Sequence, residues 1–167
     1  DPAIWAAREL TLAPVIGIAE AAFHLATMVG ERFSIVTSLG RTIPMAEHLL
    51  KLYGFESRCA GISACEVCVL DIDKCETVPK AMLDACQIAL DQHGSDVLVL
   101  GCGGMSHWAK VIEKELGVPV IEGVTAATVI LEGLYQLGIT NSKRNSLSYP
   151  LPKSFIGRFS HLSNLNF

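Results

Sequence analysis

A cysteine flanked by three glycines follows directly on an apolar run, in the stretch 97–105 that reads VLVLGCGGM. The four apolar residues predict a fully buried parallel strand, and the amphipathic pattern that begins at Ser106 predicts a helix. Cys102 is therefore expected at a strand-to-helix turn, which in open parallel sheets lies at the edge where ligands bind. Because the positive end of a helix stabilises a thiolate, Cys102 is a candidate catalytic group.

The glycines at this turn also suit it to ligand binding by the backbone. Having no Cβ, they let the backbone approach a ligand closely, and they leave amide N–H groups free to hold an oxygen atom. This makes Gly101, Gly103 and Gly104 candidate binding residues. The alternative is that Cys102 is an ordinary buried cysteine at a tight turn, since free cysteines are often packed in the core.

A second polar patch follows the predicted strand Phe33–Thr37, in the stretch 36–42 that reads VTSLGRT. The hydroxyl groups of Thr37 and Ser38 lie at the carboxyl end of this strand, where they can hold a polar ligand. The alternative is helix capping by Ser38 or Thr42, which uses the same residue types.

Alternating strands and helices must position these two turns. Helices are expected at residues 3–10, 19–29, 44–53, 78–92, 106–116 and 124–137, and strands at 33–37, 59–62, 97–100 and 118–121. Residues 66–74 are expected to be a connection, and the tail from Asn141 is expected to be irregular. Strands separated by helices form parallel sheets with right-handed crossovers, so we predict an α/β fold with a mostly parallel sheet flanked by helices.

The six cysteines of the chain raise the question of a metal or redox site. Cys65 and Cys68 form a CxxC pair, but the second CxxC or the paired histidines of a zinc site are absent from the sequence. A thioredoxin-like CxxC opens a helix, and residues 69–71 do not have that pattern. Cys86 lies on the apolar side of its predicted helix. We therefore predict no metal site and a core position for Cys86.

Composition excludes several classes of function. With 167 residues, half of them hydrophobic, the chain can bury one substantial core. The net charge of −4 comes without a basic stripe, which argues against a nucleic-acid partner. No apolar stretch approaches the ~20 residues that span a bilayer, so no membrane association is expected. We expect a soluble, cytoplasmic protein.

Four stretches form a set whose order along the chain is informative. They read APVIGIAEAA at 13–22, VTSLGRTIP at 36–44, LGCGGM at 100–105 and GVPVIEGV at 117–124. In this order they resemble the hydantoin/allantoin racemase branch of the aspartate/glutamate racemase superfamily. The resemblance implies a cofactor-independent racemase with two α/β halves and one cysteine on each side of the substrate. It also implies that Cys102 is the second catalytic cysteine and that the substrate contacts are Thr37, Ser38, Gly101, Gly103 and Gly104.

The resemblance further implies how the chain is divided. The family's first catalytic cysteine and its opening strand lie before the segment that begins here at Asp1. We expect residues 1–30 to be a remnant of the first lobe and its crossover, 31–123 to be the second α/β lobe carrying Cys102, and 124–167 to be a return segment that packs on the first lobe. The N-terminal part of the first lobe is then missing.

The implied reaction inverts the carbon stereocentre of a hydantoin-type cyclic ureide, either allantoin or a 5-substituted hydantoin. One thiolate removes a proton and a thiol on the opposite face returns it. The residues after Cys102 offer backbone amides and apolar surface, which favours a neutral ring over a zwitterion. With one thiol lacking, this chain alone is expected to be inactive.

Two alternatives stay open. One is a single-cysteine decarboxylase or cis-trans isomerase of the same superfamily, and the other is an inactive α/β binding module. A small-molecule cyclic ureide is the expected partner, and exposed apolar surface makes a homo-oligomer possible.

Overall fold

The computed structural model describes residues 1–72, 74, 76 and 78–164. These residues form one sheet of four strands in the order β2-β1-β3-β4, and every neighbouring pair is parallel. The strands are β1 (Phe33–Thr37), β2 (Cys59–Ala64), β3 (Val97–Leu100) and β4 (Val120–Glu122). The predicted fold class, a mostly parallel α/β sheet flanked by helices, is confirmed.

Helices precede, connect and follow the strands. They are α1 (Ile4–Leu10), α2 (Ile18–Val29), α3 (Ile43–Tyr53), α4 (Val69–Ile72), α5 (Lys80–His93), α6 (Ala109–Leu116) and α7 (Gly123–Gln136). Short 3-10 helices are η1 (Gly40–Thr42), η2 (Glu56–Arg58), η3 (Gly103–Trp108), η4 (Asn145–Leu147) and η5 (Gly157–Asn164).

Three expectations about local structure are wrong. The tail from Asn141, expected to be irregular, contains η4 and η5. Residues 66–74 were expected to be only a connection, yet they contain α4, a single helical turn whose four residues are too few to show a helical period. The helix expected from Ser106 begins three residues earlier as η3, because Cys102 ends the extended backbone and Gly103 starts the 3-10 turn at once.

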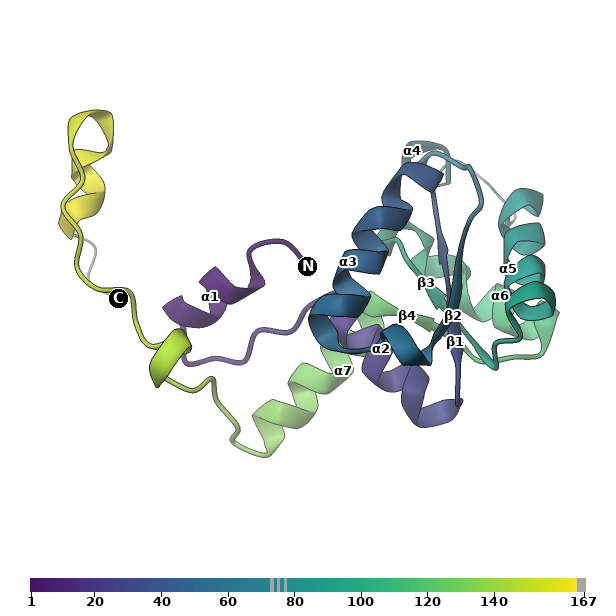
Figure 1. Ribbon diagram of the computed structural model, residues 1–167, viewed down its shortest axis with the longest axis horizontal. Helices are drawn as coiled ribbons and strands as arrows, with labels where there is room; N and C mark the ends of the chain where they lie inside the picture. The colour runs from purple at the N-terminus through teal and green to yellow at the C-terminus, as the bar shows by residue number, and fades with distance from the viewer. Residues whose placement is uncertain (73, 75, 77, 165–167) are drawn as a thin grey trace. The chain divides into compact units, whose positions relative to one another are not determined.

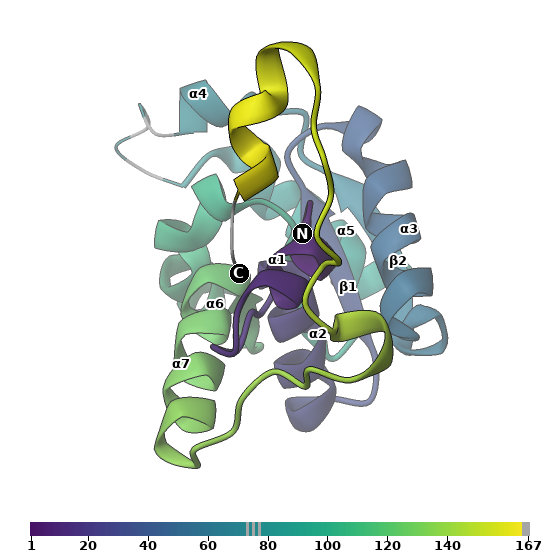
Figure 2. The same cartoon turned by 90° about the vertical axis from the view of Figure 1, so that its left-hand side faces the viewer.

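Helices cover both faces of the sheet (Figure 1), and a buried core cluster lies on each face. One face packs against α5, η3 and α6 and includes Leu98 and Leu100, while the other packs against α2 and α3 and includes Val97 and Val99. Successive side chains of β3 thus alternate between two buried clusters, which explains its unbroken apolar sequence. In the second view α3 runs beside β2 (Figure 2).

The chain divides into two compact units. The first comprises Asp1 and Gly17–Ile130 and holds the whole sheet, and the second comprises Pro2–Ile16 and Leu131–Phe167. No helix among the described residues is long and apolar enough to cross a membrane.

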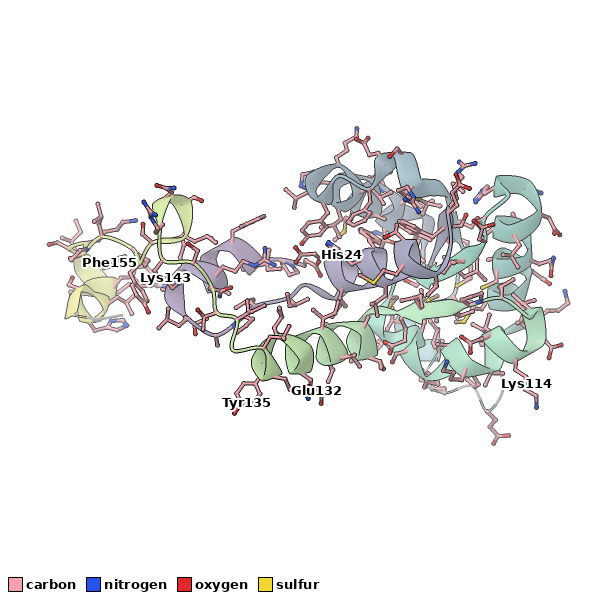
Figure 3. The ribbon with its side chains drawn as sticks, turned by 90° about the horizontal axis from the view of Figure 1, so that it is seen from below. His24, Lys114, Glu132, Tyr135, Lys143 and Phe155 are labelled. Atoms are coloured by element: carbon pink, nitrogen blue, oxygen red, sulfur yellow. The ribbon has the colours of Figure 1, made fainter. Side chains whose placement is uncertain are left out.

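Lys143, labelled in Figure 3, joins several segments of the second unit through its side chain. Its ammonium group donates hydrogen bonds to the carbonyl oxygens of Arg8, Glu9 and Leu147 and lies 4.8 Å from the ring centre of Tyr149. The last carbonyl groups of a helix have no partner inside the helix. Lys143 therefore satisfies the C-terminal end of α1 and complements its negative dipole.

Cys86 is completely buried on α5, as its sequence position predicts, with an exposed fraction of 0%. Burial raises the pKa of its thiol to about 12, whereas the ordinary pKa of a cysteine thiol in an unfolded chain is about 8.5. Above that lower value the unfolded state binds fewer protons than the folded state. The Cys86 contribution to the free energy of unfolding is therefore full below pH ~8.5 and is lost as the pH rises through about 12.

We expect this loss to be measurable by urea unfolding between about pH 8 and pH 10, with a slope of up to about 1.4 kcal/mol per pH unit from this one thiol. Cys86→Ala is the matched variant. It lowers stability at every pH by leaving a small cavity, but it should flatten the decline at high pH. An identical slope in both proteins would show that Cys86 is not responsible.

Candidate active site

A cavity of about 300 Å³ lies in the first unit, at the carboxyl edge of the sheet. Strands β1 and β3 are neighbours, and Val36 pairs with Leu100 in their register. The residues that follow each strand therefore meet at one place, as expected for a parallel sheet. Five of the predicted site residues line the cavity, namely Thr37, Ser38, Gly101, Cys102 and Gly103.

Gly101 allows the two turns to touch. Its amide N–H donates a 2.8 Å hydrogen bond to the carbonyl oxygen of Val36, so the pairing of β3 with β1 continues past the end of β3. A Cβ atom on Gly101 would lie 2.9 Å from Cγ2 of Ile35 and 3.2 Å from Cβ of Thr37. A side chain here would collide with Ile35 and press on Thr37, so glycine allows the backbone to approach β1 this closely.

Cys102 ends the extended backbone and immediately precedes η3. Its thiol is free and partly exposed. The amide N–H groups of Gly103 and Gly104 open this 3-10 helix, and the described residues offer them no acceptor, as is usual for the first amides of a helix. Gly104 does not line the cavity, but a Cβ atom on it would lie 3.8 Å from Sγ of Cys102. The thiol thus lies at the turn whose first two amides have no acceptor among the described residues.

The polar patch after β1 contains a chain of hydroxyl groups. The side-chain oxygens of Thr37 and Thr42 are 2.7 Å apart, and the Thr42 hydroxyl donates to the carbonyl oxygen of Leu39 at 2.7 Å. Neither Ser38 nor Thr42 caps η1 or α3 through its side chain, so helix capping does not account for these residues. Ser38 is buried, with an exposed fraction of 4%.

The loop after β2 holds this patch in place. The amide of Cys65 donates to the carbonyl oxygen of Thr37 at 2.9 Å, and that of Val67 donates to Ser38 at 3.0 Å. Between them, Glu66 has a left-handed backbone with φ of 53° and accepts a 2.8 Å hydrogen bond from the amide of Gly40. The β2–α4 loop therefore clamps the loop that carries the two hydroxyls.

We expect Glu66→Ala to loosen this clamp and to speed hydrogen exchange of the Gly40 amide about tenfold, because an amide that loses its carboxylate acceptor opens more readily. Glu66→Gln is the matched variant, since its side-chain oxygen can still accept the bond and its backbone strain is the same. Exchange measured by NMR on the three proteins tests this. Equal rates for Glu66→Ala and the unchanged chain would mean that the hydrogen bond does not hold the loop.

The CxxC pair lies beside the cavity rather than in it. Burial raises the pKa of the Cys65 thiol, which contacts the carbonyl oxygen of Ser38 at 3.6 Å, whereas Cys68 is exposed. A short helix, α4, does follow the pair, contrary to expectation, and its first residue Val69 lines the cavity. Cys75 lies outside the described residues. In the part of the chain that the structure describes, no group of three or more His, Cys, Asp or Glu is placed to hold a metal.

Most of the remaining wall is apolar and was not singled out from the sequence. Phe23, Ile35 and Val99 belong to the buried cluster under α2, and Met45 and Leu49 come from α3. Their periodicity is that of ordinary core residues, so spacing alone gives no sign that they face a cavity.

Asp1 also lines the cavity. Its carboxylate accepts hydrogen bonds from the amides of Ala19 and Glu20, at 3.1 and 3.0 Å, and from the hydroxyl of Tyr53 at 2.9 Å. It therefore caps the start of α2, and this contact has no local sequence signal because the partners are far apart along the chain.

Comparisons of the sequence and of the structure with known proteins lead to the same family. A model of the family described as Asp/Glu/Hydantoin racemase matches residues 1–131. A hydantoin racemase from Rhizobium meliloti is 39% identical over 158 residues, which cover 94% of this chain and 66% of that protein. The structure of an allantoin racemase from Klebsiella pneumoniae superposes with a TM-score of 0.90 at 46% identity, covering 98% of this chain and 67% of that one. Another, from Pseudomonas fluorescens, has a TM-score of 0.84 at 39% identity and covers 92% of this chain and 66% of that one.

The chain spans about two thirds of the length of the relatives it matches. The family model covers the whole sheet, both polar turns and the cysteine between the glycines. With this coverage and these identities, the chain belongs to the Asp/Glu/Hydantoin racemase family.

Proposed function

We propose that this chain forms the Cys102-bearing part of a racemase that inverts the carbon stereocentre of a hydantoin-type cyclic ureide, allantoin or a 5-substituted hydantoin. The observation that supports this most is a partly exposed thiol at a cavity beside two backbone amides with no acceptor among the described residues. The relatives described as hydantoin and allantoin racemases support the same substrate class. The proposed substrate contacts are Thr37, Ser38, Gly101, Gly103 and Gly104.

The proposed chemistry is proton transfer at the ring carbon next to a carbonyl group. The Cys102 thiolate removes the C5 proton, and the electron pair of the C–H bond moves into the adjacent carbonyl, which becomes an enolate oxygen. That oxygen then accepts hydrogen bonds from fixed donors, for which the amides of Gly103 and Gly104 are suited. When a proton returns to the opposite face, the carbon is inverted and the carbonyl is restored. No cofactor takes part in this scheme.

Inversion by this route needs an acid on the face opposite Cys102. Among the described residues that line the cavity, Cys102 supplies the one thiol. We propose that a second thiol completes the site and that the chain of 167 residues alone removes and returns the proton on one face. It would then exchange the C5 hydrogen of one enantiomer while inverting it very slowly.

Deuterium exchange tests this directly. Each enantiomer of 5-benzylhydantoin and of allantoin is incubated with the chain in D₂O, and the loss of the C5–H signal is followed by NMR alongside chiral chromatography, with a protein-free control. We expect catalysed exchange of one enantiomer with little inversion. Fast inversion by this chain would contradict the requirement for a second thiol, and no catalysed exchange of either substrate would contradict the racemase proposal.

A single-thiol reaction is the second candidate, because one thiol lines the described cavity. In such an enzyme Cys102 would protonate a planar intermediate formed by decarboxylation, or would add to a double bond during cis-trans isomerisation. Release of carbon dioxide from a substituted malonate, or formation of fumarate from maleate, would support this candidate over racemisation.

A further inference from the structure

The hydroxyl protons of Thr37 and Thr42 can be assigned from their partners. Each hydroxyl carries one proton, and a carbonyl oxygen can only accept. The Thr42 oxygen lies 2.7 Å from the carbonyl oxygen of Leu39, which also accepts a 2.9 Å hydrogen bond from the amide of Thr42. The same oxygen lies 2.7 Å from that of Thr37, where either hydroxyl could donate, and both side-chain hydrogen bonds form together only when this proton comes from Thr37.

With this assignment, the Thr37 oxygen can accept a hydrogen bond from a ligand in the cavity but cannot donate one to it. If Thr37 turned its proton toward a ligand instead, the Thr42 proton would have to turn to Thr37, and the hydroxyl hydrogen bond to Leu39 would be lost. Thr37 is 3% exposed, so little water reaches these groups. The order Thr37 to Thr42 to Leu39 is therefore favoured by one hydrogen bond over the reverse.

The position of Thr37 is fixed. Its carbonyl oxygen accepts a hydrogen bond from the amide of Cys65. Its Cβ lies so close to Gly101 that a Cβ atom added to that glycine would be only 3.2 Å away. Because Gly101 directly precedes Cys102, the acceptor stands next to the turn that presents the thiol. A ligand group that contacts Thr37 is thus close to the carbon from which the thiol would take a proton.

We propose that Thr37 accepts a hydrogen bond from a ring N–H of the substrate, and that Thr42 is a positioning residue that makes Thr37 an acceptor. This inference rests on the proposed function, and it adds a reason why the site would prefer ligands with N–H groups over carboxylates. A cyclic ureide offers N–H groups, whereas a carboxylate offers only lone pairs and meets repulsion at this point. The enolate oxygen must then be held by the backbone amides near Cys102 and not by Thr37.

Binding of N-methylated ligands tests the proposal without requiring turnover. The affinities of hydantoin, 1-methylhydantoin, 3-methylhydantoin and acetate for the chain are measured by isothermal titration calorimetry. Methylation of the nitrogen that faces Thr37 removes one hydrogen bond to a buried acceptor and should weaken binding about tenfold, while methylation of the other should matter less. Acetate should bind far more weakly than hydantoin.

Thr42→Val is the decisive variant, because it removes the acceptor of the Thr37 proton and frees Thr37 to donate. The tenfold preference for the unmethylated ring should fall to about twofold, and acetate should gain affinity. Thr42→Ser keeps both hydrogen bonds and should keep the preference. Thr128→Val removes a threonine hydroxyl that donates to the carbonyl oxygen of Val124 on α7, away from the cavity lining, and it controls for the substitution itself.

The outcomes separate this proposal from the proposed function. An unchanged preference in a folded Thr42→Val protein, or the absence of hydantoin binding to the unchanged chain, overturns the assignment of Thr37 as an acceptor. Selective binding without any C5 exchange overturns the racemase proposal and leaves the acceptor role supported. If Thr42→Val does not fold, Thr37→Ser and Thr37→Val decide, since the first should retain the preference and the second should lose it.

Discussion

Cys102→Ser is expected to slow C5 deuterium exchange by at least about a hundredfold, the contribution typical of a positioned general base. Serine keeps nearly the same size and position at the start of η3, so the cavity and the free amides of Gly103 and Gly104 should be preserved. What changes is the ability to hold a negative charge, because a hydroxyl ionises far less readily than a thiol. Exchange of the reactive enantiomer, followed by NMR in D₂O, measures the effect.

Cys68→Ser is the matched control for this experiment. Cys68 is exposed and belongs to the CxxC pair next to the cavity, so it tests whether loss of any nearby thiol slows exchange. We expect its exchange rate to equal that of the unchanged chain. If Cys68→Ser is as slow as Cys102→Ser, or if Cys102→Ser retains full exchange, the thiol of Cys102 is not the base.

Gly123→Ala is expected to lower the free energy of unfolding by about 3 kcal/mol, the upper part of the usual range for overpacking a core. Gly123 begins α7 and is buried against the start of α2. A Cβ atom on it would collide with the carbonyl group of Ile18, whose carbon would be 2.8 Å away. The obstacle is backbone, which cannot turn aside as a flexible side chain can, so α7 and α2 would have to move apart.

The same helix provides the control. Gly133 also lies in α7, but a Cβ atom on it would meet no atom of the described residues within 4 Å outside the helix's own backbone. Gly133→Ala should therefore stabilise the protein, by up to about 1 kcal/mol, because alanine favours a helix more than glycine does. Urea unfolding of the two variants gives the comparison. Similar changes in both would show that helix propensity, and not the contact with Ile18, controls stability at Gly123.

The helix and strand order was predictable because its signals are local. Helices α3, α5 and α6 end where the sequence places Gly54, Gly94 and Gly117, and all three adopt left-handed backbones that disfavour other residues. The unbroken apolar run of β3 likewise predicts a strand buried on both faces. By contrast, α4 is a single turn, and no periodic pattern can indicate an element of that length.

The candidate site was predictable only in part, for a related reason. Cys102 and the glycines around it stand out because a thiol at a strand end can act as a base and the glycine amides beside it can bind an oxygen atom. The clamp by Glu66 and the cap by Asp1 join segments that are far apart along the chain, so no spacing rule reveals them. The apolar wall residues, such as Phe23 and Leu49, look like any other core positions until the cavity itself is seen.

The pairing of Val36 with Leu100 also has a kinetic consequence. Thr37 and Cys102 meet only after two strands that are remote in the sequence have paired, and contacts of this kind form slowly because a long loop must be closed first. A partly folded chain therefore has no binding site. A ligand that occupies the cavity should slow unfolding of the sheet and should not speed its folding, since it can bind only what has already been assembled.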